Sequence, residues 1–404
     1  MKICSEQKCI WIINEYAGSP EHGLHFRHYS LAREFIRHGY NVVIISASYS
    51  HLLRNPPRTR GWFTKEIIDG ISYIWVKVPS YDRSHSPVRL LKWLVFSASL
   101  FFLPRLPRPQ AIIVAPTATY PILPAYFLSR KNHCRFIVEI KDVWPQTIME
   151  LANVSKFHPL IVSMAWMEKF GIEKACKVTS NLPNYGNYLR EKGMDTDFEY
   201  IPNGVDFHEI SENEPLRPSV EKLLPSTGFI IGYAGTLGCA NALDYLIGAA
   251  SQITNPDIHF VIVGKGQEKK RLERLAAGLK NVSFLPNIPK KQVPSLLARF
   301  DVCYIGWNVL NIYNYGVAAN KIFEYMYAEK PVLHSYSNGF DLIKEAECGI
   351  TVEAENPNAI AEGILRLYEF PEKKRREMGR NGKKFVMENH SYEKLANKYI
   401  KIFE

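Results

Sequence analysis

The sequence lacks the patterns of several protein classes. Its seven cysteines are scattered singly, with no Cys-x-x-Cys pair, which argues against a disulfide framework or a zinc site. No apolar stretch reaches the roughly 20 residues that a membrane-spanning helix needs. A signal peptide is not expected, because Glu6 and Lys8 interrupt the first apolar run. Tandem repeats and low-complexity tracts are also absent. We therefore expect a globular protein of the reducing cytoplasm.

Two blocks of the chain alternate apolar, strand-like runs with helical segments. The runs are CIWIIN, NVVIISA, ISYIWVKV, AIIVAP and RFIVEI in the first block, and FIIGYAG, IHFVIVG, VSFLP, DVCYIGW and KPVLHS in the second. Continuous apolar runs are typical of buried parallel strands. The polar, proline-containing segment 207–228 is predicted to be a linker. We expect two doubly wound α/β domains facing a central cleft, residues 1–206 and 229–389, with a helix over about 390–404 that packs back on the first domain.

Basic residues are concentrated in one part of the first block. The net charge of the chain is +10, and residues 51–110 hold ten basic and three acidic residues. This window contains SPVRLLKWLVFSASLFFLPRLPRP, which predicts a helix over 87–103 that Pro104 ends. Two interpretations fit the periodicity equally, a core helix with basic flanks or a helix lying on an anionic bilayer. Nucleic-acid binding is disfavoured, because the charge lies beside an apolar helix rather than among stacking aromatics.

The bilayer interpretation assigns roles to ten side chains of this helix and the residues just after it. The residues expected to enter the membrane are Leu90, Leu91, Trp93, Leu94, Phe101 and Phe102. The residues expected at the lipid headgroups are Arg89, Lys92, Arg105 and Arg108.

Two glycine turns follow predicted strands of the second block. GYAGTLG contains Gly235 and Thr236, and VIVGKGQ contains Gly264 and Gly266. Glycines let backbone N–H groups approach a ligand, and the carboxyl ends of parallel strands are where α/β sheets bind ligands. The spacing is not the dinucleotide pattern GxGxxG. The two turns together indicate a nucleotide phosphate compound.

Two further segments place charged residues at strand ends or in apolar surroundings. Lys141 and Asp142 follow RFIVEI, where Asp142 either caps the next helix or joins a site with Trp144 as a wall for a sugar.

Glu324 lies within NKIFEYMY, and a carboxylate among such apolar residues needs a partner. That partner is Lys321, three residues earlier, or a ligand.

Two patterns resemble metal sites. His22, His25 and His28 are spaced three apart, but no cysteine or carboxylate cluster joins them, so metal binding is not expected. Asp195 and Asp197 form a DxD sequence between a helical segment and a strand, where a solvated turn is the simpler interpretation.

Several segments resemble the GT4 family of retaining glycosyltransferases. YIPNGVD, GYAGTLG, VIVGKGQ and YGVAANKIFEYMYAEKPVL occur in that family's order and spacing, and GSPEHG, FRHYSLAREFIRHGYNVVIIS and KDVWP resemble its O-antigen and exopolysaccharide branch, typified by L-fucosamine transferases. The resemblance covers nearly the whole chain. It implies a GT-B fold of two Rossmann-like domains, with a UDP-linked sugar donor held mainly by the second domain and the acceptor by the first.

The resemblance also implies roles for individual residues. Glu324 matches the second glutamate of the EX7E motif, whose carboxylate accepts hydrogen bonds from the donor ribose. The loop from Gly316 to Asn320 matches the loop whose amides face the diphosphate and sugar, and Gly18 lies in the first domain's glycine loop. Gly316 occupies the position of the first EX7E glutamate. The Arg and Lys that usually follow the GxL turn are missing, and Lys321 is the expected substitute.

The mechanism implied for this family is front-face attack with retention of configuration. The acceptor hydroxyl approaches on the side where the nucleotide leaves, and a phosphate oxygen takes its proton, so positioning and charge stabilisation dominate. Lys321 and the amides near Gly235 would stabilise the leaving diphosphate, while Lys141 and Asp142 would lie near the acceptor hydroxyl. Relatives often have histidine or arginine at position 141. No metal or other cofactor is expected.

The expected acceptor is a sugar on a polyprenyl diphosphate, in bacterial O-antigen, capsule or exopolysaccharide biosynthesis. The enzyme would then be peripheral on the cytoplasmic face of the plasma membrane, on anionic lipid, through helix 87–103. Two other functions stay open. A nucleotide-sugar 2-epimerase has the same architecture but no need of that helix, and the altered cation positions are compatible with a non-catalytic nucleotide-sugar-binding scaffold in a polysaccharide assembly complex.

Overall fold

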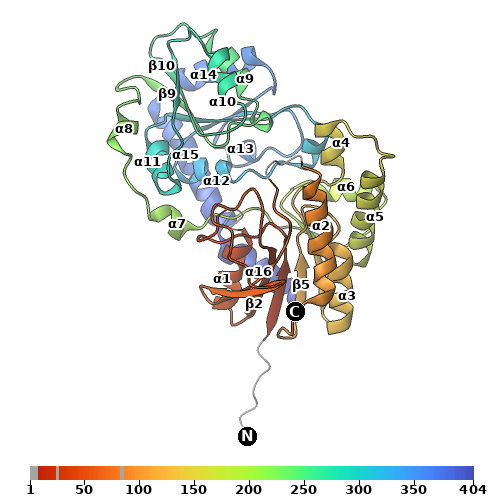
Figure 1. Ribbon diagram of the computed structural model, residues 1–404. Helices are drawn as coiled ribbons and strands as arrows, with labels where there is room; N and C mark the ends of the chain where they lie inside the picture. The colour runs from red at the N-terminus through yellow and green to blue at the C-terminus, as the bar shows by residue number, and fades with distance from the viewer. Residues whose placement is uncertain (1–7, 24–26, 82–85) are drawn as a thin grey trace. The chain divides into compact units, whose positions relative to one another are not determined.

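The computed structural model describes residues 8–23, 27–81 and 86–404 (Figure 1). Its internal contacts divide the chain into two compact units. Unit 1 comprises Met1–Asn203 and Tyr392–Glu404, and unit 2 comprises Gly204–Ser391. The last helix of the chain therefore belongs with the first half of the sequence.

Unit 1 is built on an eight-stranded sheet with the order β3-β4-β2-β1-β5-β6-β7-β8, parallel except for the edge strand β3. The strands are β1 (Cys9–Ile13), β2 (Asn41–Ala47), β3 (Phe63–Ile68), β4 (Ile71–Val76), β5 (Ala111–Val114), β6 (Arg135–Ile140), β7 (Lys177–Ser180) and β8 (Phe198–Tyr200). The order reverses at β1, which pairs with β2 on one side and β5 on the other. This reversal is the topological switch point, beside which parallel sheets bind ligands.

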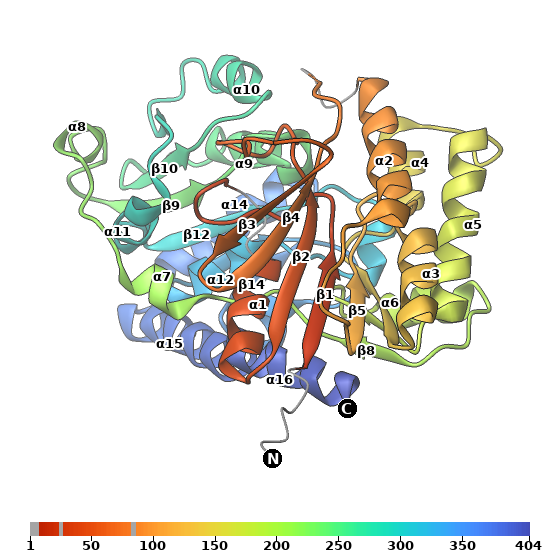
Figure 2. The same cartoon turned by 60° about the horizontal axis from the view of Figure 1, so that its bottom comes forward.

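Helices cover the sheet of unit 1 (Figure 2). They are α1 (Arg27–Arg37), α2 (Val88–Ser99), the 3-10 turn η1 (Leu100–Phe102), α3 (Ile122–Asn132), α4 (Gln146–Ala152), α5 (Pro159–Lys174), α6 (Tyr185–Glu191) and α16 (Tyr392–Phe403). Helix α16 packs on α1, where Phe35 meets the rings of Tyr399 and Phe403 edge-on. These aromatic contacts fix the last helix to unit 1.

Unit 2 contains a six-stranded sheet with the order β11-β10-β9-β12-β13-β14, and all its pairings are parallel. The strands are β9 (Phe229–Ala234), β10 (Ile258–Val263), β11 (Val282–Leu285), β12 (Val302–Gly306), β13 (Val332–Ser335) and β14 (Gly349–Val352). The 3-10 turns are η2 (Cys239–Asn241), η3 (Lys290–Gln292) and η4 (Asn311–Tyr315). The helices are α7 (Phe207–Ser211), α8 (Pro218–Glu221), α9 (Leu243–Ala250), α10 (Lys269–Leu275), α11 (Val293–Ala298), α12 (Asn320–Tyr327), α13 (Leu342–Glu345), α14 (Pro357–Glu369) and α15 (Glu372–Asn389).

The prediction of two doubly wound α/β domains is confirmed. Residues 207–228, which we expected as a linker, instead belong to unit 2 by their contacts. Leu216, Val220 and Leu224 are buried in its core beside α7 and α8. Three apolar side chains in and around the short helix α8 thus anchor the segment, although its overall composition is polar.

Candidate functional site

The two predicted glycine turns of unit 2 pack directly on each other. The Gly235 N–H donates to Val263 O (2.9 Å), and the Leu237 N–H donates to Lys265 O (2.9 Å). A side chain at Gly264 would lie 1.8 Å from Gly235 O, and one at Gly266 would lie 2.0 Å from Leu237 O. The glycines are therefore required for close backbone packing. The amide of Gly235, expected to face a diphosphate, is already hydrogen-bonded within the sheet.

Lys321 reaches this turn from the first turn of α12. Its ammonium donates to Tyr233 Oη (2.7 Å) and Asn241 Oδ1 (2.5 Å). The same Nζ lies 3.1 Å from the place that a Cβ at Gly235 would take, so a larger residue there would press on the ammonium. Burial lowers the pKa of Lys321 to about 8, and Glu324 opposes that shift. The ammonium of Lys321 thus lies against the turn after β9.

Glu324 has a different partner from the one suggested by its sequence neighbours. Its carboxylate forms an ion pair with Lys290 in η3, not with Lys321. The neighbouring residues of α12 face inward, and Tyr325 Oη bonds to both the N–H and the carbonyl of Ala234. Glu324 keeps 22% of its side chain exposed. The helix is therefore fixed by Tyr325 while Glu324 is left at the surface of the unit.

A pocket of about 340 Å³ lies beside the Lys290–Glu324 pair, and Val293, Leu297 and Tyr327 contribute apolar side chains to its wall. Both residues of the ion pair also line it. The glycines of the predicted site, all within the described residues, do not line this pocket. The carboxylate of Glu324 is consequently within reach of a small molecule.

Gly316 directly follows η4, in the connection between β12 and α12, and has a φ of +110°, in a region that favours glycine. A glutamate would be strained at this position. Asn320, the other residue expected in this loop, is exposed at the start of α12. Both positions lie in the segment that leads directly into Lys321.

A partly buried chain of hydrogen bonds supports the start of this loop. The Trp307 indole N–H donates to His334 Nε2 (3.1 Å), and His334 Nδ1 bonds to Asp341 Oδ1 (3.0 Å). Burial raises the pKa of Asp341, but the bond to His334 and the other interactions around this carboxylate together outweigh burial and lower the pKa to about 2. Sequence reasoning missed these residues, because the bond between Trp307 and His334 spans two separate strand ends.

The remaining predicted site residues lie in unit 1. Lys141 is half-buried and Asp142 is exposed directly after β6. Burial lowers the pKa of Lys141 below its ordinary value, and the carboxylates of Glu139 and Glu15 only partly oppose that shift. Gly18 is buried, and its carbonyl accepts a hydrogen bond from Tyr73 Oη (2.9 Å).

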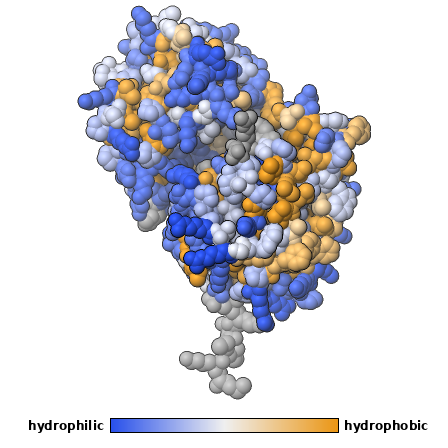
Figure 3. Space-filling model, in the orientation of Figure 1, coloured by the Kyte–Doolittle hydropathy of each residue, from blue (hydrophilic) through white to orange (hydrophobic). Residues whose placement is uncertain are grey.

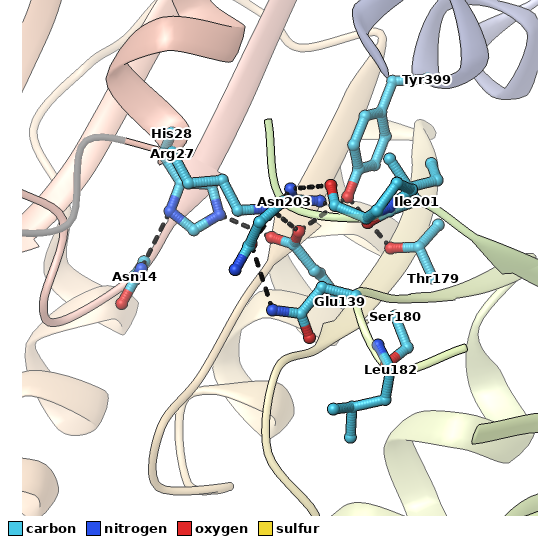
Figure 4. A network of polar contacts seen from close by, with 12 residues as sticks. Asn14, Arg27, His28, Glu139, Thr179, Ser180, Leu182, Ile201, Asn203 and Tyr399 are labelled. Atoms are coloured by element: carbon cyan, nitrogen blue, oxygen red, sulfur yellow. Dashed lines mark hydrogen bonds and ion pairs between the residues drawn. The ribbon is translucent and has the colours of Figure 1, made fainter. Parts of the chain in front are cut away.

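A buried ionic network surrounds Glu139 in unit 1 (Figure 4). Its carboxylate bonds to Arg27 Nε (2.7 Å), His28 Nε2 (2.5 Å) and Tyr399 Oη (2.9 Å). Burial alone would raise the pKa of Glu139, but Arg27 and His28 hold it well below its ordinary value. Burial lowers the pKa of His28, so its neutral ring donates from Nε2 and accepts from Asn14 at Nδ1. These charges hold β6, α1 and α16 together.

Glu15 follows β1 at the switch point, and sequence reasoning missed it. The residue is 1% exposed, and its Oε1 accepts the N–H groups of Thr117 and Ala118, each at 3.0 Å. Its Oε2 is buried without a hydrogen-bond partner among the described residues. A carboxylate directly after a buried strand was the signal that could have identified it.

Side chains of unit 1 hold His22 and His28 of the histidine pattern. His28 is part of the Glu139 network, and His25 lies outside the described residues. Within the described residues, Glu21, His22 and Glu66 form a group that could hold a metal ion. Glu66 already accepts a hydrogen bond from the Trp75 indole (2.6 Å) and contacts His22 at 3.5 Å.

The DxD pattern lies just before β8. Asp197 forms an ion pair with Lys177 (2.6 Å), and Asp195 is exposed. One aspartate therefore pairs with a neighbouring strand, and the other faces solvent.

Two family models match the chain in succession. A glycosyl transferase 4-like domain matches residues 22–204, and the model of glycosyl transferases group 1 matches residues 218–385. With the two parallel sheets, these matches define a glycosyltransferase of the GT-B fold. Within that class, the chain belongs to the GT4 family, so the expected enzyme class and fold are confirmed.

Known proteins resemble the chain at low sequence identity. The Escherichia coli (strain K12) protein WcaI, described as a glycosyl transferase of colanic acid biosynthesis, is 26% identical over 252 residues, and the chain spans 61% of WcaI, using 59% of its own length. Sucrose-phosphate synthase from Thermosynechococcus elongatus has a TM-score of 0.71 at 16% identity and 98% coverage of both chains. Anabaena HepE in complex with UDP has a TM-score of 0.66 at 14% identity, covering 98% of this chain and 99% of HepE. These structures support the fold.

Proposed function

We propose that the protein is a retaining glycosyltransferase that moves a sugar from a UDP-linked donor to a lipid-linked saccharide in bacterial surface polysaccharide biosynthesis. Membership of GT4 supports the reaction class. The resemblance to WcaI supports an exopolysaccharide pathway, and HepE, which was solved with UDP and with UDP-glucose, supports a uridine nucleotide. Polyprenyl diphosphate is the proposed lipid carrier of the acceptor.

The observation that carries the proposal is the position of Lys321. Its ammonium lies on the turn after β9, at the carboxyl edge of the sheet of unit 2, bonded to Tyr233 and Asn241. Parallel sheets bind ligands at this edge, and a cation there can neutralise a diphosphate. Glu324 lies three residues further along α12, one helical turn away, and is the proposed partner of the ribose hydroxyls.

In the proposed reaction, Lys321 stabilises charge that grows on the leaving diphosphate. Gly316 and Asn320 belong to the adjacent loop, whose backbone amides would face the diphosphate and the sugar. The acceptor hydroxyl attacks the anomeric carbon on the face that the diphosphate leaves, and the phosphate oxygen takes its proton. No metal is needed in this scheme. In unit 1, Lys141 and Asp142 are proposed to lie near the acceptor hydroxyl, and Gly18 remains a proposed donor contact.

Thermal shift with a panel of nucleotide-sugars tests the proposal first. A ligand at one hundred times its Kd raises the unfolding free energy by about 2.7 kcal/mol, which is readily measured. The stabilising donor is then incubated with lipid-linked saccharide extracts, and the product is analysed by mass spectrometry and NMR. A product with retained anomeric configuration supports the proposal. Release of the nucleotide together with a 2-epimerised sugar, in the absence of acceptor, would identify an epimerase instead, and binding without any turnover would identify a scaffold.

A further inference from the structure

The outer side of α2 and η1 is apolar and exposed. Leu91, Leu94, Phe101 and Phe102 are 50%, 45%, 53% and 75% exposed, respectively. Leu91 and Leu94 are three residues apart, so they lie on the same side of α2. These four side chains are exposed, as the bilayer interpretation of helix 87–103 requires. That interpretation is wrong for Trp93 and Lys92, which are 6% and 0% exposed and so cannot meet lipid.

Two neighbouring helices extend this apolar surface. Phe127 on α3 is 52% exposed and lies 6.2 Å from the ring of Phe101. Trp166 on α5 is 55% exposed and stacks on Phe170, which meets Tyr126 of α3 edge-on. Figure 3 shows apolar side chains gathered over this side of unit 1. We call Leu91, Leu94, Phe101, Phe102, Phe127 and Trp166 the apolar face.

The segment that contributes most of the apolar face carries charge of one sign only. From residue 86 to residue 138 the sequence has no aspartate or glutamate. The basic residues in this segment are Arg89, Lys92, Arg105, Arg108, Arg130, Lys131 and Arg135. Arg130 and Lys131 follow Phe127 by three and four residues, which puts them on the same side of α3. Lys169 follows Trp166 by three residues, which puts it on the same side of α5.

We propose that the apolar face docks on the surface of an anionic lipid bilayer. Exposed Trp and Phe side chains next to Lys and Arg are the composition of interfacial helices, which lie in the headgroup region. The described helices include none that is long and apolar enough to cross a membrane, so the contact is with one leaflet. A second copy of the chain fits this face less well, because its basic residues would repel their own copies.

The inner side of α2 connects the apolar face to the switch point of unit 1. The Trp93 indole N–H and Arg89 Nε both lie 3.1 Å from Tyr16 Oη. Lys92 Nζ lies 3.5 Å from Glu15 O and 3.7 Å from the centre of the Tyr16 ring. One helix thus contacts lipid on one side and the carboxyl end of β1 on the other. The inference rests on the proposed function at this point, because a lipid-linked acceptor explains why these two features share a helix.

Co-sedimentation of the full chain with vesicles tests the docking. We expect binding to phosphatidylcholine vesicles that contain phosphatidylglycerol, much weaker binding to phosphatidylcholine alone, and a steady loss as salt screens the charges. The variant Leu94→Gln/Phe102→Gln should lower the partition coefficient at least about tenfold. Trp166→Gln should lower the partition coefficient about threefold. No change would mean that α2 and η1 bind lipid without α5. The control is Leu275→Gln, at a leucine of unit 2 that is 50% exposed, close to the 45% of Leu94, and it should leave binding unchanged.

Several outcomes would overturn the docking proposal. Equal binding to both vesicle types, or binding to neither, would exclude an anionic surface. Unchanged binding by the double variant would move the contact elsewhere. A wild-type dimer that Leu94→Gln/Phe102→Gln converts to a monomer, without vesicle binding, would show that a second copy covers the face. Thermal shift with nucleotide-sugar is run on each variant. Vesicle binding by a protein that neither binds nor turns over a donor would refute the proposed function and leave the docking intact.

Discussion

Both units are α/β folds on largely parallel sheets, yet the carboxylates of Glu139 and Glu324 are held in different ways. In unit 1, Glu139 is 0% exposed and contacts Arg27, His28 and Tyr399 at once. In unit 2, Glu324 is 22% exposed in its side chain and has one ion-pair partner, Lys290, which is itself 42% exposed. The first arrangement is closed to solvent, and the second can exchange its partner for a ligand.

The difference follows from the cost of desolvating a charge. A fully buried carboxylate must keep its partners, because losing one leaves a charge in a medium of low dielectric constant. A half-exposed carboxylate loses little when water or a hydroxyl group replaces an ammonium partner. We infer that the charges around Glu139 hold unit 1 together, whereas Lys321 and Glu324 are available for binding. The predictions below test that contrast, beginning with the largest expected effect.

Replacing Glu139 by glutamine should lower the unfolding free energy by about 3–5 kcal/mol, because Arg27 would lose its carboxylate inside the unit. Urea unfolding followed by circular dichroism measures the change. Glu34→Gln removes an ion pair with the exposed Arg37 and should change stability by less than about 0.5 kcal/mol. A similar small loss for both variants would contradict the contrast between the units.

The same network makes a prediction about acid. The pKa of Glu139 lies well below 4.5 in the folded state, so the unfolded state binds more protons as the pH falls below 4.5. The lowered pKa of His28 has the same sign below pH 6.5, because its ring charges only after unfolding. Wild-type stability should therefore fall from about pH 6.5 downward. Glu139→Gln should show a shallower fall below pH 4.5, measured by urea midpoints across pH.

Lys321→Met should lower kcat about a hundredfold, since a cation that stabilises the leaving diphosphate acts mainly in the transition state. The pKa of about 8 adds a pH test for the free enzyme. The protonated form is lost as the pH rises through 8, so kcat/KM for the donor should fall there. A change in KM alone would remove Lys321 from this role. Lys344→Met, at an exposed lysine of the same unit, is the control.

Glu324→Gln should weaken donor binding by about 1.5–3 kcal/mol, because it replaces a charged acceptor of the ribose hydroxyls by a neutral one. Calorimetric titration with the nucleotide-sugar measures the change. Glu221 is the control, since it also forms a surface ion pair in unit 2, with Arg299, and Glu221→Gln should bind donor like the wild type. Equal affinities for Glu324→Gln and wild type would refute the ribose assignment.

The smallest expected effect concerns the loop before Gly316. Trp307→Phe keeps an aromatic ring but removes the N–H that bonds to His334. The loss of this hydrogen bond should destabilise the ordered conformation of the loop by about 1 kcal/mol. Donor affinity should fall about fivefold, with the melting temperature nearly unchanged. Tyr245→Phe, a half-buried ring on α9, serves as a comparison. A drop in melting temperature without a change in affinity would make Trp307 a structural residue only.

The sequence predicted the long apolar strands well and missed several strands that are short or partly polar, such as β3, β7 and β14. Strands such as β1 and β9 are continuous apolar runs because both faces of a central parallel strand are buried. The edge strand β3, FTKEII, was missed, since one face meets solvent and its polar residues hide the pattern. The segment 207–228 was misjudged for a related reason, because three buried side chains spaced four apart carry little weight in its composition.

Candidate residues near each other in sequence were recognised, but their partners were not. Lys321 and Glu324 stand in one motif, whereas Lys290 precedes Glu324 by 34 residues. Arg27 and Glu139 are 112 residues apart. Motif spacing reports which residues share a turn or a helix face, and it contains no information about which distant strand end will lie beside them.

The sequence by itself determined the two α/β units, the glycine turns, and the presence of Lys321 and Glu324 on one short helix. These features are local, because hydrophobic period, turn chemistry and helix geometry act over a few residues. Only the tertiary structure decided that Gly264 and Gly266 serve backbone packing, that Lys290 holds Glu324, and that Lys92 faces inward while Phe127 and Trp166 extend the apolar face. Burial and ion pairing depend on which segments fold against each other, and that is fixed by the packing of the whole unit.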